Sequence, residues 1–202
     1  MRDNSNQLQP FAEVVESSLH YFVAQCWDWD VFPSFGSIVQ IEEEDFFILG
    51  CVSNVQTGSM DPMRYPFPYQ KTEKELKQKH PHIFEFLKTT FTVITLGYIT
   101  KNDHKSCYVL PSKPGKIHSF VQNASIDVQK NFLKSAQFLH VLFANASQTS
   151  NIDELFLSVI MRMREQNILK DSNIYGYCKT FSLITGNDYK RLKIFLQRLQ
   201  LL

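Results

Sequence analysis

The sequence lacks the long apolar runs and leader segments that direct proteins into membranes or out of the cell. Its longest apolar stretches, such as residues 138–146, fall well short of the roughly 18 residues that span a bilayer. Residues 1–10 are polar and contain no apolar signal core. We therefore expect neither a membrane span nor secretion.

Cysteine is scarce, and its four copies are scattered. Cys26, Cys51, Cys107 and Cys178 form no Cys-x-x-Cys pair, and none lies near another in the sequence. Together with the missing signal core, this spacing predicts free thiols in a reducing compartment. A bacterial cytoplasm or an organelle matrix such as a plastid stroma fits that expectation.

Motifs of the familiar nucleotide-binding and hydrolytic enzymes are also missing. Gly115 and Lys116 are followed by Ile117 and lack the upstream glycine of a phosphate-binding loop. No G-x-G-x-x-G, H-E-x-x-H or G-x-S-x-G pattern occurs. His80 and His82 offer two ligands, whereas zinc takes three or four. The sequence therefore predicts no catalytic residue, no metal site and no cofactor.

Neither sign of charge is in excess. The chain has 21 Lys and Arg against 20 Asp and Glu, which gives a net charge of +1 and predicts no bulk affinity for nucleic acid. The signs are nonetheless separated. Residues 1–60 hold nine acids and one arginine, and residues 61–120 hold ten basic and five acidic residues. Such asymmetry can steer a partner, but we expect the two regions to neutralise each other within the fold.

The first third of the chain has the pattern of short strands. Segments rich in aromatic and β-branched residues alternate with polar breaks, and no ten-residue helical period lies between them. An acidic run at residues 42–45 predicts a hairpin turn. These features indicate an antiparallel barrel or sandwich. The predicted strands are residues 11–16, 19–26, 36–41 and 46–55.

The middle third combines turns, a helix and further strands. Residues 57–62 have turn chemistry, and Thr72 with Glu75 predicts a capping box that opens an inserted helix over about residues 72–90. Pro81 can start a second helical turn. Strands are expected at residues 91–98 and 106–110.

The last third is predicted to be helical. Ser125, Asn151 and Asp188 are candidate N-caps, and a further helix is expected to begin at Asp171 or Ser172. The first of these helices is expected to continue to about Ala146. The predicted class is therefore α+β, with a small antiparallel β-barrel followed by an α-helical bundle. The predicted domains are residues 1–10 as an extended or disordered terminus, 11–120 as the barrel and 121–202 as the helical domain.

Several side chains are candidates for contacts with other molecules. Trp27 and Trp29 alternate with acids, which favours a core position at a strand edge over stacking on nucleic acid bases. A candidate basic surface comprises Lys113, Lys116, Arg162 and Arg164. The most unusual segment, residues 57–64, predicts either a structured turn or a docking loop on the barrel surface.

The segments ILGCVSNVQTGSMDPMRYPFPY, KTEKELKQKHPHIFEFLKTTFTVITLGY and LPSKPGKIHSFV resemble the HAS-barrel domain. This is the small barrel shared by HerA-type DNA-translocating ATPases and the catalytic subunits of rotary ATP synthases. The resemblance covers roughly residues 10–120. Gly58, Asp61, Pro62 and Arg64 are its characteristic combination and form the candidate docking loop. No ATPase motor motif accompanies the barrel.

The resemblance implies a non-catalytic interaction or assembly module. Such a module would form homo-oligomers through barrel edges, or would bind a separate ATPase or nuclease as an adaptor. Two alternatives remain open. A nucleic-acid-binding accessory factor predicts that the four basic residues share one face. An enzyme of unrecognised type predicts a pocket that collects His118 or His104 with Cys107 and a carboxylate.

Overall fold

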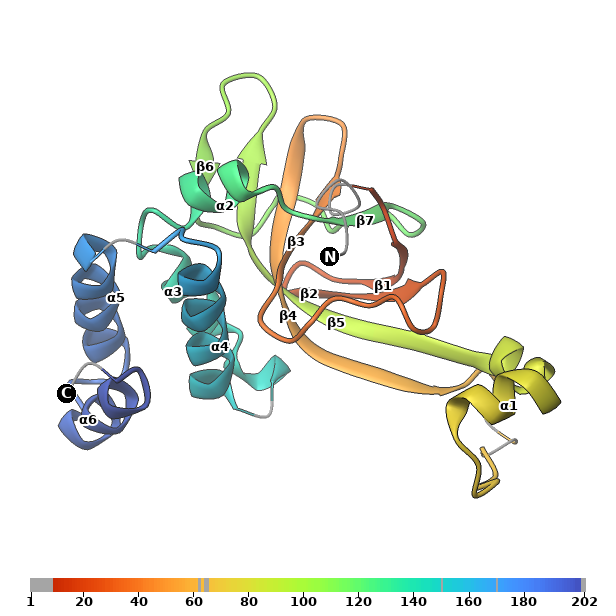
Figure 1. The fold of residues 1–202 in the computed structure, drawn as a ribbon. Helices are drawn as coiled ribbons and strands as arrows, with labels where there is room; N and C mark the ends of the chain where they lie inside the picture. Colours follow the sequence, from red (N-terminus) through yellow and green to blue (C-terminus); the bar gives the residue numbers. More distant parts are fainter. Residues whose placement is uncertain (1–8, 62, 64–65, 150, 170, 201–202) are drawn as a thin grey trace.

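The computed structural model describes residues 9–61, 63, 66–149, 151–169 and 171–200. Most of the predicted N-terminal segment, residues 1–8, lies outside them. Within these residues, seven strands precede five α-helices of the C-terminal part, and one short α-helix is inserted between the fourth and fifth strands. Figure 1 shows a central barrel with the helices on one side and a long two-stranded projection on the other.

Six strands close into an antiparallel barrel in the order β1–β2–β5–β4–β3–β7 and back to β1. The seventh, β6, adds a two-residue edge to β5. The predicted class, an antiparallel barrel followed by helices, is confirmed. The strands are β1 Ala12–Ser17, β2 Tyr21–Cys26, β3 Ile38–Glu42, β4 Phe46–Ser59, β5 Leu87–Thr100, β6 Ser106–Cys107 and β7 Phe120–Asn123.

Alternation along the strands builds two apolar clusters, one on each side of the barrel wall. In β3, Val39 lies in the interior cluster and the adjacent Ile38 lies in the outer one. In β5, Val93 and Ile94 divide in the same way. The outer cluster continues into the helices, so the helical part packs directly on the barrel wall. The interior cluster comprises Ala12, Val14, Phe22, Ala24, Cys26, Val39, Ile41, Ile48, Val52, Phe91, Val93 and Val121.

The helices begin where the sequence predicted caps. Thr72 and Glu75 form the full capping box, and the side chains of Ser125, Asn151 and Asp188 each accept a hydrogen bond from a first-turn N–H. The helices are α1 Glu73–Lys79, η2 Pro81–Phe86, α2 Ile126–Phe132, α3 Phe138–Ala144, η3 Ala146–Gln148, α4 Ile152–Glu165, α5 Asp171–Ile184 and α6 Tyr189–Arg198.

An aromatic stack joins the last three helices. Phe156 of α4 stacks on Phe195 of α6 with ring centroids 4.9 Å apart, and Phe181 of α5 stacks on Phe195 at 4.5 Å. All three side chains are buried. Offset stacks of this kind stabilise by about 0.5–1.5 kcal/mol per pair beyond the area they bury. The stack therefore holds α4, α5 and α6 together beside the barrel (Figure 1).

The prediction of a single helix from Ser125 to about Ala146 is wrong. Helix α2 ends at Phe132 and α3 begins at Phe138, with turns between them. Tertiary hydrogen bonds take up the carbonyls that a continuous helix would use: Tyr177 Oη donates to the carbonyl of Leu133, and Asn173 Nδ2 donates to that of Lys134 at 3.1 Å. The periodicity of the apolar residues across this region could not reveal these contacts, because their donors come from α5.

Two boundaries in the middle of the chain also differ from prediction. Residues 57–59, expected in a turn, continue strand β4, and residues 87–90, expected in the inserted helix, already belong to β5. The two strands pair from Phe46 with Thr100 to Ser59 with Leu87. Pairing across this long hairpin supplies hydrogen bonds that outweigh the local turn and helix signals. At the other end, β6 is two residues long instead of the five expected.

The opposite charges of the N-terminal and middle regions meet within the fold, as expected. Lys101 pairs with Glu42 at 2.6 Å, and Lys116 pairs with Glu44 at 2.7 Å. The backbone N–H of Lys116 also donates to Glu43 at 2.9 Å. In addition, β7 straddles the predicted boundary at residues 120/121 and closes the barrel between β1 and β3.

Candidate interaction site

Strands β4 and β5 extend beyond the barrel as a two-stranded arm. In the described structure β3 pairs with β4 no further than Cys51, and β2 pairs with β5 no nearer the hairpin end than Thr90. Residues 57–59 and 87–89 therefore pair only with each other. They carry the described part of residues 60–86, which we call the arm tip (Figure 1).

The loop after β2 braces the arm against the barrel. Trp29 stacks on Phe84 of η2 with ring centroids 5.6 Å apart. Thr89 Oγ1 donates to the carbonyl of Trp29 and lies 2.7 Å from Thr57 Oγ1 on the opposite strand. Lys77 Nζ lies 5.6 Å from the centre of the Phe84 ring. Trp29 thus joins the loop after β2 to both β5 and η2 of the arm.

The tip folds through local contacts and has no buried core of its own. Glu75 Oε2 accepts from the N–H of Thr72 at 2.8 Å, and these hydrogen bonds lower the pKa of Glu75. Lys77 pairs with Glu73 at 2.7 Å. Neither α1 nor η2 contains a buried residue. A helix of one or two turns is marginal alone in water, and packing normally supplies its stability. The tip therefore presents apolar side chains that the described residues leave uncovered.

An aromatic groove of about 590 Å³ lies at the tip. Its walls come from the extended segment before α1 and from η2, and Phe67, Tyr69, Phe84 and Phe86 line it. The Phe67 side chain is 71% exposed, and that of the neighbouring Met63 is 90% exposed. Contiguous exposed apolar groups of this size are typical of interaction sites.

The groove has a lysine in its lining. Lys71 lines it, and Lys74 and Lys79 lie exposed on α1, the helix that follows. Among the described residues, none of these three lysines forms an ion pair. The two acids of α1 already have partners: Glu73 pairs with Lys77, and Glu75 accepts a hydrogen bond in the capping box. The charged side chain in the groove lining, Lys71, is therefore a cation with no ion-pair partner among the described residues.

The candidate docking loop lies at the base of the tip. Gly58 is in β4, where a β-carbon would meet nothing within 4 Å. Asp61 accepts from the N–H of Met63 at 2.9 Å, and its own N–H donates to Ser59 Oγ at 3.2 Å, so it stabilises its turn as the sequence suggested. Pro62 and Arg64 lie outside the described residues.

The four residues of the candidate basic surface are not brought together by the fold. Lys113 and Lys116 precede β7, and Lys116 pairs with Glu44. On α4, Arg162 Nε donates to the carbonyl of Phe35 at 2.8 Å. Arg164 Nη1 instead donates to the carbonyl of Leu199, beyond α6, at 2.9 Å. The two arginines therefore point to different neighbours.

Two of the candidate catalytic groups, His104 and Cys107, lie on the β5–β6 hairpin, and the third, His118, lies at the β1–β7 pair. His118 Nδ1 is 3.1 Å from Glu13 Oε2, near the β1–β7 pair. His104 is in the turn after β5, and Cys107 is in β6. In the part of the chain that the structure describes, no group of three His, Cys, Asp or Glu side chains is placed to hold a metal ion.

Trp27 differs from the core position expected for it. Its side chain is 52% exposed. It packs edge-on against Phe120 at 5.4 Å, and its Nε1 donates to Glu13 Oε1 at 3.0 Å. It thus stabilises the surface of the β1–β7 pair.

Sequence reasoning missed the aromatic groove. The signal lay in the close spacing of Phe67, Tyr69, Phe84 and Phe86, but whether such residues are buried depends on what packs over them. Comparison of the sequence with protein-family models and with curated proteins finds no match. No helix within the described ranges is long and apolar enough to cross a membrane.

Proposed function

We propose that this protein is a non-catalytic interaction module whose arm tip docks on a protein partner. The observation that carries the proposal is the uncovered tip: two short helices without a buried residue, held at the end of a braced arm. Burying these apolar side chains against a partner would supply the packing that the tip lacks.

The HAS-barrel resemblance supports the same assignment. A closed six-stranded antiparallel barrel agrees with it, and Gly58 and Asp61 of the candidate docking loop lie at the base of the arm tip. In motor proteins of that family the barrel helps to hold subunits together. By analogy, the partner class we favour is a subunit of a larger assembly, such as a separate ATPase.

The side chains of the tip indicate which kind of partner segment would bind there. The groove suits apolar or aromatic side chains, and Lys71 in its lining, with Lys74 and Lys79 exposed on α1, favours carboxylates beside those side chains. We therefore propose a protein segment in which an apolar anchor is flanked by Asp or Glu. Within the closed barrel each of the six strands has two neighbours, so self-association by strand pairing would have to use edges outside it, such as those of the arm.

The alternative of a nucleic-acid-binding accessory factor has less support. Nonspecific binding to nucleic acid depends on several cations that face the same phosphate backbone. Arg162 and Arg164 instead hold backbone carbonyls of different elements, and Lys116 is paired with Glu44.

Site-specific photocrosslinking in the native cell tests the proposal. A benzophenone side chain is placed at Phe67 in the groove and, as the control, at Tyr189 on α6, where the native side chain is 72% exposed. We expect a discrete protein adduct from position 67 that is absent from position 189 and is lost when Lys71 and Lys74 are changed to Glu. No adduct from position 67, or the same adducts from both positions, would contradict the proposal.

A further inference from the structure

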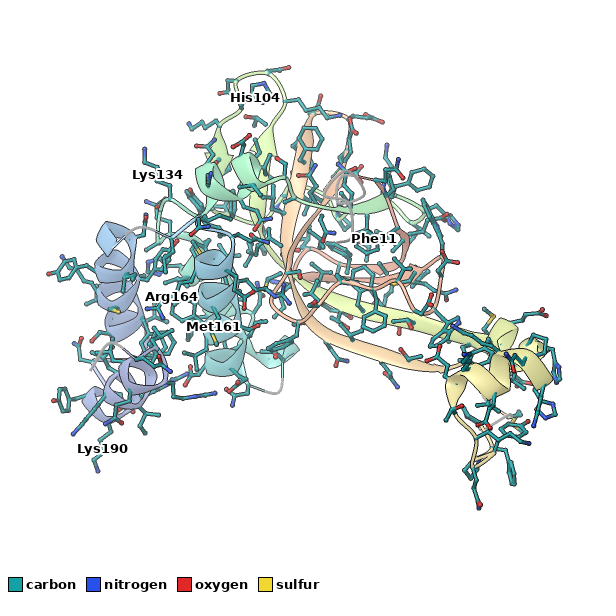
Figure 2. All side chains as sticks on the ribbon, viewed as in Figure 1. Phe11, His104, Lys134, Met161, Arg164 and Lys190 are labelled. Carbon is teal, nitrogen blue, oxygen red and sulfur yellow. The ribbon has the colours of Figure 1, made fainter. Side chains whose placement is uncertain are left out.

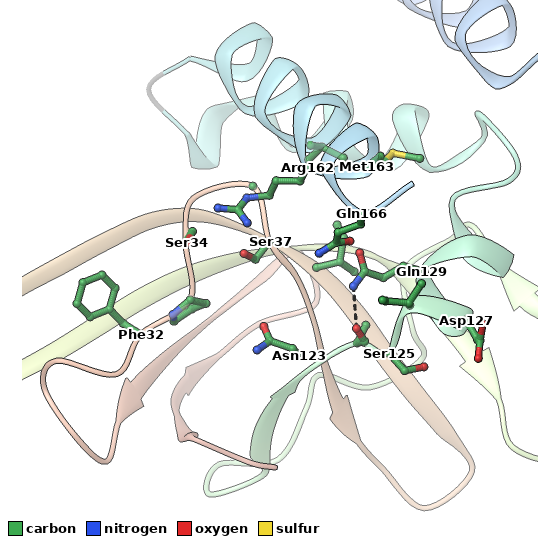
Figure 3. A pocket seen from close by; sticks show the side chains of 16 residues that line it. Phe32, Ser34, Ser37, Asn123, Ser125, Asp127, Gln129, Arg162, Met163 and Gln166 are labelled. Atoms are coloured by element: carbon green, nitrogen blue, oxygen red, sulfur yellow. Dashed lines mark hydrogen bonds between the residues drawn. The ribbon is translucent and has the colours of Figure 1, made fainter. Parts of the chain in front are cut away.

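A second cavity lies between the barrel and the helical part, far along the chain from the arm tip. It measures about 450 Å³, within the range of small-molecule sites. Its walls come from the loop before β3, from the segment joining β7 to α2, and from α4 (Figure 3). We call this cavity the junction cleft.

The first wall is fixed tightly to α4. The carbonyl of Phe35 accepts two hydrogen bonds from α4, from Ser158 Oγ at 3.0 Å and from Arg162 Nε at 2.8 Å. The next residue, Gly36, has φ of +79°, and a β-carbon there would lie 2.5 Å from Ser158 Oγ. Only glycine permits both this backbone conformation and this approach. The cleft is therefore preformed on this side.

The second wall is fixed by backbone pairing and a buried amide. The N–H of Ala124 donates to the carbonyl of Ile38 at 3.0 Å. Gln129 Nε2 in turn donates to the carbonyl of Ala124 at 2.7 Å, the hydrogen bond drawn in Figure 3. Both walls therefore hold their shape without a ligand, which reduces the ordering cost of binding.

Arg162 is the one basic side chain of the junction cleft lining. The side chain is half-buried, and Figure 3 shows its guanidinium at the cleft beside Ser34 and Ser37. With Nε bound to Phe35, the two terminal nitrogens remain available, and no acidic residue in the described ranges forms an ion pair with Arg162. A guanidinium held in this way presents a fork that matches a carboxylate or a phosphate.

The remaining lining suits the body of a small polar molecule. Ser37 and Asn123 are half-buried, and no hydrogen bond links their side chains to other described residues. Val159 and Met163 supply an apolar surface on α4. Asp127 also lines the cleft and is exposed, so it would repel a second negative group on the ligand.

We infer that the junction cleft binds a small metabolite through one anionic group, a carboxylate or a phosphate, held by Arg162. Ser37 and Asn123 would bind hydroxyl or amide groups of the same molecule. The inference does not depend on the proposed function of the arm. The ligand would bridge barrel and helices, so it would also stabilise their contact.

Two-dimensional amide NMR of the full chain tests the inference, with inorganic phosphate and butyrate as separate probes. We expect at least one probe to shift the amides of Ser37, Asn123 and Arg162 saturably. Arg162→Gln should weaken that binding by at least about tenfold, the order of one charge-assisted hydrogen bond. The probe whose binding saturates shows whether the site takes a phosphate or a carboxylate.

Two controls separate charge from structure. Ser158→Ala removes the other hydrogen bond to Phe35 and leaves the guanidinium, so binding should stay within about threefold of the wild type. Arg164→Gln removes a cation of α4 that faces α6 and should leave binding unchanged. The inference is overturned if neither probe saturates, or if Ser158→Ala or Arg164→Gln weakens binding as much as Arg162→Gln does.

Discussion

The ring of Trp29 lies nearly parallel to that of Phe84, at 23° with centroids 5.6 Å apart. The two residues are 55 positions apart in the sequence, one in the loop after β2 and the other in η2. Figure 2 shows the side chains gathered at the end of the two-stranded projection, where α1 lies. This contact makes the arm a directed projection of the barrel, which a docking element requires.

Trp29→Ala should loosen the arm without unfolding the barrel. Loss of the stacked pair is expected to cost about 1–2 kcal/mol of unfolding free energy, and amide exchange at residues 57–59 and 87–89 should quicken. Hydrogen–deuterium exchange measures this directly. Trp27→Ala is the matched control, because Trp27 packs on Phe120. Equal acceleration in both variants would contradict the assigned role of Trp29.

Gly36→Ala should destabilise the contact between barrel and α4. The positive φ and the 2.5 Å approach to Ser158 Oγ predict a loss of about 1–3 kcal/mol in unfolding free energy, measured by urea denaturation. Gly58→Ala is the control, because a β-carbon there meets nothing and its φ is not in the left-handed region. It should change the unfolding free energy by no more than about 0.5 kcal/mol. A tolerated alanine at position 36 would show that the loop does not need this close approach.

Tyr177→Phe should weaken the junction between α2 and α3. The buried hydroxyl of Tyr177 donates to the carbonyl of Leu133, and its removal leaves that carbonyl without its partner. The expected cost is about 1–3 kcal/mol in thermal or urea unfolding. Tyr175→Phe on the same helix alters an exposed ring and should be neutral. Equal stability of the two variants would mean that the break between the helices has another cause.

The four thiols should react with iodoacetamide in a defined order at pH 8. Burial raises the pKa of Cys26 to about 12 and that of Cys51 further, so the reactive thiolate of Cys26 is about one part in ten thousand at this pH. Burial also raises the pKa of Cys178. Cys107 is partly exposed and should be alkylated first.

Peptide mapping by mass spectrometry of the native protein reads out this order. Cys26 and Cys51 should be modified only after denaturant is added. Alkylation of either at the rate of Cys107 in native conditions would mean that the barrel opens far more readily than its buried core implies.

The sequence predicted the elements whose signals are local. Within the residues that the structure describes, the side chains of Thr72 and Asn151 each bond only to the first turn of the helix that follows them. Both helices begin as expected. The short aromatic and β-branched segments separated by polar breaks likewise indicated an antiparallel barrel or sandwich, and the structure is a closed barrel.

The predictions that were wrong concern features that depend on residues far away in the sequence. The break between α2 and α3 is stabilised by Tyr177 and Asn173, and the extension of β4 to Ser59 depends on pairing with Leu87. Of the turn predicted at residues 57–62, a turn is present at Asp61, whereas residues 57–59 belong to β4. The groove above it depends on which aromatic rings remain uncovered, and local sequence signals do not carry that information.

The most direct test of the central claim compares co-purification by three tagged chains from the native cell in gentle salt. The chains are the wild type, the tip double variant Met63→Ser/Phe67→Ser, and Tyr189→Ser on the helical side. Tip docking predicts a stoichiometric protein partner with the wild type and Tyr189→Ser that falls at least about tenfold with the tip variant, since exposed anchors of this kind dominate binding energy. A partner retained by the folded tip variant, or no stoichiometric partner with any chain, would contradict the claim.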